Sequence, residues 1–120
     1  MNIQEQIDNI NSLELDKRIN FITDLINISN SYILGDGNHS LGLNIINCLS
    51  SLRTSRFIES DTDIKLLDIS LRIARKLKGE SDILKGILND LMYYSNFYPE
   101  KYNKETLQNE IDRINKESPI

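Results

Sequence analysis

The chain is poor in the residues that most often carry enzyme chemistry. Its 120 residues include one cysteine, Cys48, and one histidine, His39, and they include no tryptophan and no valine. A lone cysteine excludes an internal disulfide and a cysteine-rich metal site. A lone histidine excludes the helix with paired histidines that binds zinc. Because Cys48 lies in an aliphatic stretch, we expect its thiol to be buried and inert.

Long apolar runs and targeting signals are also missing. No apolar run approaches the roughly 18 residues that a membrane-spanning helix needs. The first residues form neither the basic nor the apolar segment of a secretory signal peptide. We therefore expect a cytoplasmic protein that makes no membrane contact.

Nucleotide, metal and catalytic motifs are equally scarce. The glycine spacing of the turn at 35–37 matches neither nucleotide-binding fingerprint. Asp36, His39 and Ser40 have the residue types of a catalytic triad, but close neighbours in one turn cannot readily adopt the geometry of a triad. The aspartates after residue 60 suit a helix N-terminus better than a calcium loop. We therefore predict a non-catalytic chain that needs no cofactor and no metal.

Large aliphatic residues are abundant, with 19 Ile and 16 Leu, whereas Ala74 is the only alanine. Their spacing is helical throughout, and no stretch alternates with period two for long enough to indicate a strand. We predict an all-α fold, residues 1–120 forming a single helical domain, built as a compact antiparallel bundle of five to six helices. A short α-α repeat is the alternative, because the hairpins 14–54 and 61–98 are loosely alike.

Cap and turn signals place the helices along the chain. We expect them at about 2–11, 14–34, 40–54, from Ser60 to the stop at Gly79, 82–98 and 103–116. Ser60, Ser81 and Asn103 are expected to cap the last three helices. The apolar spacing also predicts which residues form the core. They are Leu15, Ile19, Phe21, Ile22, Leu25, Ile26, Ile28 and Ile33 in the second helix, Leu41, Ile45, Cys48, Leu49 and Leu52 in the third, Ile64, Leu67, Leu71, Ala74 and Leu77 in the fourth, and Leu107, Ile111 and Ile114 in the last.

The net charge of −4 is unevenly distributed. Residues 1–52 carry six acids and two bases, residues 53–78 four acids and seven bases, and residues 79–120 eight acids and five bases. An acidic chain is a poor general binder of nucleic acid and suits a basic protein partner better. The middle segment is interpreted as a solvated face, with a DNA-reading helix or a protein contact as alternatives. Its bases include Arg53, Arg56, Lys65, Arg72, Arg75 and Lys76.

Five aromatic residues fall within ten positions near the end of the fifth predicted helix. A helical wheel places Tyr94 and Tyr98 on the buried stripe. It places Tyr93 and Phe97 on the opposite face, beside Asp90. Two interpretations remain open. Either the last helix covers this face, or the face is an exposed patch of the kind that binds proteins.

A small, acidic helical domain with a surface of Tyr and Asp resembles the immunity proteins of bacterial polymorphic toxin and contact-dependent growth inhibition systems. The segment Gly35-Asp36-Gly37-Asn38-His39-Ser40-Leu41-Gly42-Leu43-Asn44-Ile45-Ile46 is similar to the helical Maf-type immunity family, which has a polar glycine turn followed by an aliphatic helix. The resemblance implies a cytoplasmic inhibitor that binds a cognate toxin domain, often a basic nuclease, and blocks its active site or its substrate surface.

The first hypothesis is therefore an immunity protein that neutralises a toxin by binding it. Carboxylates would steer the cationic partner, and aromatic rings would form the centre of the contact. The expected partner-binding residues are Glu80, Asp82, Asp90, Tyr93, Phe97, Glu100 and Tyr102. Asp36 and Glu59 are weaker candidates. The alternatives are a DNA-associated regulator that uses the basic segment 53–78, and a structural subunit that forms a homodimer through its aromatic face.

Overall fold

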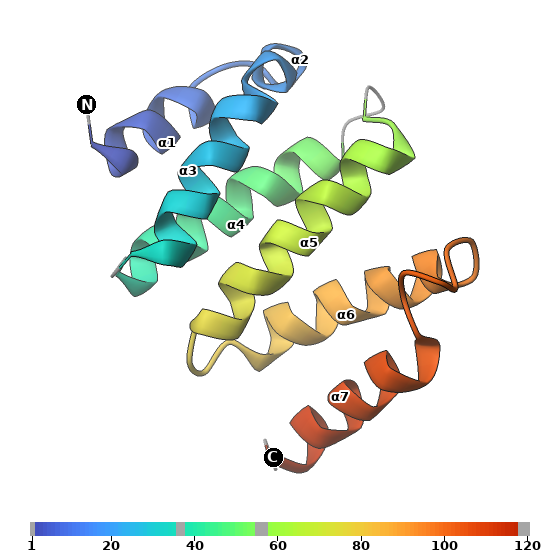
Figure 1. Cartoon of the computed structure of the whole chain (residues 1–120). Helices are drawn as coiled ribbons and strands as arrows, with labels where there is room; N and C mark the ends of the chain where they lie inside the picture. The colour runs from blue at the N-terminus through green and yellow to red at the C-terminus, as the bar shows by residue number, and fades with distance from the viewer. Residues whose placement is uncertain (1, 36–37, 55–57, 118–120) are drawn as a thin grey trace. The chain divides into compact units, whose positions relative to one another are not determined.

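The computed structural model describes residues 2–35, 38–54 and 58–117, and within these ranges the chain is helical and contains no β-strand (Figure 1). The elements are α1 (Ile3–Asn11), α2 (Leu15–Arg18), the 3₁₀ turn η1 (Ile19–Phe21), α3 (Ile22–Leu34), α4 (His39–Arg53), α5 (Ser60–Lys76), α6 (Ser81–Ser95) and α7 (Lys104–Glu117). Apart from the single turn of α2, these are six α-helices. The predicted all-α fold of five to six helices is confirmed. None of the described helices is long and apolar enough to cross a membrane.

Backbone contacts divide the chain into two compact units, Met1–Leu77 and Lys78–Ile120. The first unit contains α1 to α5, and the second contains α6 and α7. The single domain expected for residues 1–120 stays a prediction, and each unit is described by itself below.

In the first unit, α5 packs against both α3 and α4, and α1 packs against α4 (Figure 1). The inner face predicted for α4 is buried along its whole length, at Leu41, Ile45, Cys48, Leu49 and Leu52. Leu71, which the sequence places in the buried stripe of α5, is only half-buried, whereas the helix buries other residues because it has neighbours on two sides. Its buried residues are Asp63, Ile64, Leu66, Leu67, Ile69, Ser70, Ile73 and Ala74.

Helices α3 and α4 approach each other closely at Gly42. A Cβ atom at this position would lie 2.5 Å from the Tyr32 Oη and 2.8 Å from a methyl carbon of Leu77. Tyr32 is itself buried, and its hydroxyl donates a hydrogen bond to the Asn38 carbonyl at 3.3 Å. Glycine is therefore required here by the space between the helices.

The C-terminal end of α3 is closed by a lysine from another helix. Lys76 Nζ donates hydrogen bonds to the carbonyl oxygens of Tyr32, Ile33 and Gly35, at 3.1, 2.7 and 2.9 Å. The last carbonyls of a helix have no partner inside the helix, and they carry the negative end of the helix dipole. Lys76 thereby ties α5 to α3.

Asparagine side chains, and not serine side chains, cap the N-termini of three helices. The side chains of Asn2, Asn38 and Asn103 accept hydrogen bonds from the first turns of α1, α4 and α7, at 2.8, 2.8 and 3.0 Å. The predicted cap at Asn103 is confirmed, whereas the predicted caps at Ser60 and Ser81 are wrong. Helical hydrogen bonding already starts at the carbonyls of the two preceding residues, Glu59 and Glu80, so each serine lies inside the first turn.

The second predicted helix is broken in the structure. Residues 14–34 form α2, η1 and α3, and the 3₁₀ turn changes the angular spacing of side chains along the chain. Leu15 is consequently 37% exposed and Phe21 is 38% exposed. Their predicted place in the core is wrong, whereas Leu25 and Ile28 beyond the break are buried as predicted. The other predicted core residues of this segment are half-buried, namely Ile19, Ile22, Ile26 and Ile33.

The second unit is a pair of packed helices, α6 and α7. Helix α6 buries Ile87, Leu88, Leu91 and Ser95, and α7 buries the predicted stripe Leu107, Ile111 and Ile114. Lys85 Nζ donates a hydrogen bond to the side-chain oxygen of Asn115 at 3.1 Å, which links the two helices at the surface.

Candidate functional site

The C-terminal end of α6 carries exposed aromatic rings. Tyr93 is 61% exposed and Phe97 is 62% exposed, so helix α7 does not cover this face of α6. Asp90 lies one helical turn before Tyr93 and is also exposed. Of the two interpretations of this face, the structure therefore shows that Tyr93 and Phe97 are exposed, whereas their part in protein binding stays a prediction.

Two consecutive turns hold the segment after α6. The Tyr94 carbonyl accepts hydrogen bonds from the backbone N–H groups of Phe97 and Tyr98, at 3.0 and 2.9 Å. The Tyr98 carbonyl accepts them from Lys101 and Tyr102, at 3.1 and 3.0 Å. The backbone that carries Phe97, Tyr98 and Tyr102 is therefore held by hydrogen bonds.

The rings also support one another. The ring centroid of Tyr93 lies 5.3 Å from that of Phe97 and 5.5 Å from that of Tyr94, and the Tyr94 ring lies 6.4 Å from the Tyr98 ring. These spacings are in the favourable range for tilted and edge-to-face aromatic pairs. Tyr94 is half-buried and connects the exposed rings to the body of the unit.

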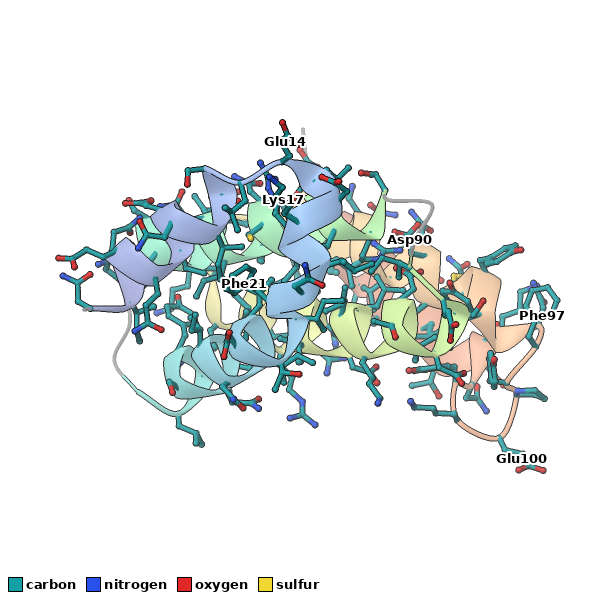
Figure 2. The ribbon with its side chains drawn as sticks, turned by 90° about the horizontal axis from the view of Figure 1, so that it is seen from above. Glu14, Lys17, Phe21, Asp90, Phe97 and Glu100 are labelled. Carbon is teal, nitrogen blue, oxygen red and sulfur yellow. The ribbon has the colours of Figure 1, made fainter. Side chains whose placement is uncertain are left out.

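A groove of about 320 Å³ follows these rings, lined by Phe97, Tyr98, Pro99, Glu100 and Lys101. Figure 2 shows Phe97 near the end of α6 and Glu100 on the loop beyond it. We call Asp90, Tyr93, Phe97, Tyr98 and Glu100 the aromatic surface. It combines rigid rings with two carboxylates, and rings of this kind supply much of the binding energy in protein interfaces.

Tyr98 was not expected at this surface. The sequence predicts it in the core of a helix that runs to residue 98, but α6 ends at Ser95 and Tyr98 is 37% exposed. That prediction is wrong, because α6 ends three residues before Tyr98. The residue before a proline is disfavoured in the helical conformation, which agrees with a helix that ends ahead of Pro99.

The seven predicted partner-binding residues do not all gather in one place. Glu80 and Asp82 lie at the start of α6, and the eleven residue steps from Asp82 to Tyr93 span about 16 Å along the helix axis. The exposed Asp82 carboxylate lies 3.9 Å from Lys85 Nζ. Of the seven residues, Tyr93 and Phe97 are in ring contact, Asp90 lies one helical turn before Tyr93, and Glu100 lines the same groove as Phe97.

Tyr102 belongs to the same turn region but is half-buried. The ammonium group of Lys101 lies 5.2 Å from the centroid of its ring, within the range of a cation–π contact. Tyr102 therefore contributes less open surface than Tyr93 or Phe97.

No family matches the chain, and neither a curated protein nor a solved structure is significantly similar to it. The resemblance to immunity proteins accordingly stays a prediction.

The residues considered for catalysis lie apart from the aromatic surface in sequence. His39 and Ser40 are exposed in the first turn of α4, and Asp36 lies outside the described residues. Cys48 is fully buried, and burial raises the pKa of its thiol to about 11, although the charge of Arg18 opposes the shift. Such a thiol is a poor nucleophile. Within the described ranges, no cluster of three or more His, Cys, Asp or Glu side chains is placed to hold a metal ion.

The basic segment divides into structural and exposed residues. Arg53 forms an ion pair with the buried Asp63, and Lys76 closes the end of α3. Lys65 and Arg72 are exposed on α5, as is Arg75, and Arg56 lies outside the described residues. Arg53 and Lys76 are therefore used inside the first unit, which weakens the case for a DNA-reading helix.

Proposed function

We propose that this chain is a non-catalytic binding protein of the immunity type, which binds a basic toxin domain through the aromatic surface. The observation that carries the proposal is the exposure of Tyr93 and Phe97 beside Asp90. Exposed, closely spaced large rings are uncommon on a surface that binds nothing, and tyrosine is enriched at the centres of protein interfaces.

In this proposal each residue of the surface has its own role in binding. Binding would bury the rings of Tyr93 and Phe97 against the partner. The loss of conformational entropy would be small, since the two rings already contact each other and the backbone that carries them is hydrogen-bonded. Asp90 and Glu100 would lie around them and attract cationic side chains. Charges at the edge of an interface mainly accelerate association and select the partner.

The two carboxylates at the start of α6 act differently in this proposal. Asp82 lies about 16 Å along the axis from Tyr93 and Glu80 lies farther away, so both are beyond the screening length of about 8 Å at physiological salt. They contribute to the general acidic field that steers a basic domain, and they do not contact the residues that touch Tyr93.

Co-purification tests the proposal directly. The chain is expressed with an affinity tag together with the product of the adjacent upstream gene. We expect a stable complex, and we expect Tyr93→Ala to weaken it by about 2 kcal/mol or more, as the loss of a central interface residue does. Failure to recover a complex, or a Tyr93→Ala complex within about threefold of the wild-type affinity, contradicts the proposal.

Two substitutions with the same change of charge distinguish direct contact with the partner from long-range electrostatic attraction. Asp90→Lys and Asp112→Lys change the net charge equally, and Asp112 is exposed on α7. We expect Asp90→Lys to slow association more than Asp112→Lys, with the difference shrinking at high salt. Equal effects of the two variants would place the contact elsewhere. A dimer of the free chain that Tyr93→Ala dissociates would instead support the alternative of a self-associating subunit.

A further inference from the structure

A second groove lies in the first unit, between α1 and the start of α3. It has a volume of about 190 Å³ and is lined by Gln6, Asn9, Ile10, Phe21, Asp24 and Ile28. The groove exists because α1 packs mainly on α4, whereas α3 packs mainly on α5. Figure 2 shows Phe21 at the junction of η1 and α3.

The lining of this groove is amphipathic. Ile10 and Ile28 are 5% and 6% exposed and form an apolar floor, and Phe21, at 38% exposed, offers part of its ring. Asp24 adds an exposed carboxylate, and Gln6 and Asn9 add amide groups. The volume is below the 300 to 1,000 Å³ typical of cofactor and drug-sized pockets. A single long side chain suits this space better than a cofactor.

The surroundings of the groove are negatively charged. Residues 2–35 include two bases, and Arg18 donates its three hydrogen bonds internally, to the carbonyls of Leu13 and Asn11 and to the Ser51 hydroxyl. Lys17 is then the only exposed base of this range. The exposed acids of the same range are Glu5, Asp8, Glu14, Asp16 and Asp24.

We propose that the α1–α3 groove binds an arginine side chain of a basic polypeptide. The aliphatic part of the arginine covers Ile10 and Ile28, and its planar guanidinium lies against the Phe21 ring and the Asp24 carboxylate. Arginine fits this lining better than lysine, because a guanidinium can stack on an aromatic ring and pair with a carboxylate at the same time. The proposal concerns the first unit and does not depend on the function of the aromatic surface.

Two capped tripeptides test the groove on the full chain. One is Ala-Arg-Ala, and the other replaces arginine by citrulline, which has nearly the same shape but no charge. In a heteronuclear NMR titration, we expect the arginine peptide to shift the side-chain amide signals of Gln6 and Asn9 and the backbone signal of Phe21. The dissociation constant should be in the millimolar range. The citrulline peptide should bind about threefold to fivefold more weakly, as expected for the loss of one exposed ion pair.

Two variants of equal charge complete the test. Asp24→Asn should remove the preference for arginine over citrulline, whereas Asp16→Asn, an exposed acid outside the groove, should keep it. Both substitutions are on the surface, and a well-dispersed spectrum checks that each variant is folded. Equal binding of the two peptides, equal losses in the two variants, or no shift at the groove residues at about 10 mM peptide would overturn the proposal.

Discussion

Substitution of Gly42 by alanine adds one methyl group where the first unit has no room for it. The new Cβ would lie 2.5 Å from Tyr32 Oη, 2.9 Å from Tyr32 Cζ and 2.8 Å from a methyl carbon of Leu77. Both neighbours are buried, so neither can simply turn into solvent. Relief requires that α3 and α4 move apart or that the hydroxyl of Tyr32 gives up its hydrogen bond to the Asn38 carbonyl.

Two effects of opposite sign set the magnitude. Alanine in a helix is more stable than glycine by about 1 kcal/mol, which favours the variant. Overpacking of a buried site costs about 1 to 3 kcal/mol, and loss of a buried hydrogen bond costs about 1 kcal/mol more. We therefore expect Gly42→Ala to lower the free energy of unfolding by about 1 to 3 kcal/mol.

Urea denaturation followed by far-UV circular dichroism measures this change. Tyr32→Phe removes the oxygen atom closest to the new methyl group, so Gly42→Ala should cost less in the Tyr32→Phe background, by about 1 kcal/mol. Gly86→Ala is the control, because a Cβ atom there would meet nothing within 4 Å. The control should stabilise the protein slightly. A Gly42→Ala variant as stable as the wild type would refute the close packing of α3 on α4.

Two further predictions concern the first unit. Lys76→Met should lower the free energy of unfolding by about 1 to 2 kcal/mol, since the last carbonyls of α3 lose their hydrogen-bond donor. Lys65→Met, on the exposed side of α5, is the control. Equal losses of stability in the two variants would contradict the capping role of Lys76. The raised pKa of Cys48 predicts stability that is complete below pH 9.0, the ordinary value for the thiol, and that falls as the pH rises towards about 11, because the unfolded thiol ionises first. Cys48→Ala should make the loss of stability over this range less steep, and an unchanged slope in urea titrations would contradict the burial of the thiol.

The helices that could be predicted well are those whose apolar stripe is continuous. Helix α4 lies within one residue of its predicted range, and α7 buries the three predicted residues. The break at Ile19–Phe21 could not be predicted, since no glycine or proline marks it. Arg18, just before the break, is held by tertiary hydrogen bonds that include the distant Ser51.

The structural role of Lys76 was equally hidden. In the sequence Lys76 is one more base beside Arg72 and Arg75, because its partners belong to a helix more than forty positions away. Only the tertiary arrangement of α3 and α5 distinguishes the lysine that caps a helix from the bases that face solvent.

The aromatic surface could be predicted in part. A helical wheel correctly separates the exposed Tyr93 from the half-buried Tyr94, since both lie within the regular part of α6. The wheel ignores distance along the axis, so it could not separate Asp82 from the rings. It also extends the helix too far, and for this reason it misplaced Tyr98.

The affinity of the Tyr93→Ala, Phe97→Ala double variant for the partner that co-purifies with the wild-type chain tests the central claim most directly. Isothermal titration of the wild type and the double variant, side by side, gives the two dissociation constants. If the exposed rings form the centre of the contact, the double variant should bind at least about 30-fold more weakly, which corresponds to about 2 kcal/mol. Leu34→Ala, a change at a large apolar side chain of the first unit that is 89% exposed, should leave the affinity unchanged. A folded double variant that binds within about threefold of the wild type would contradict the account.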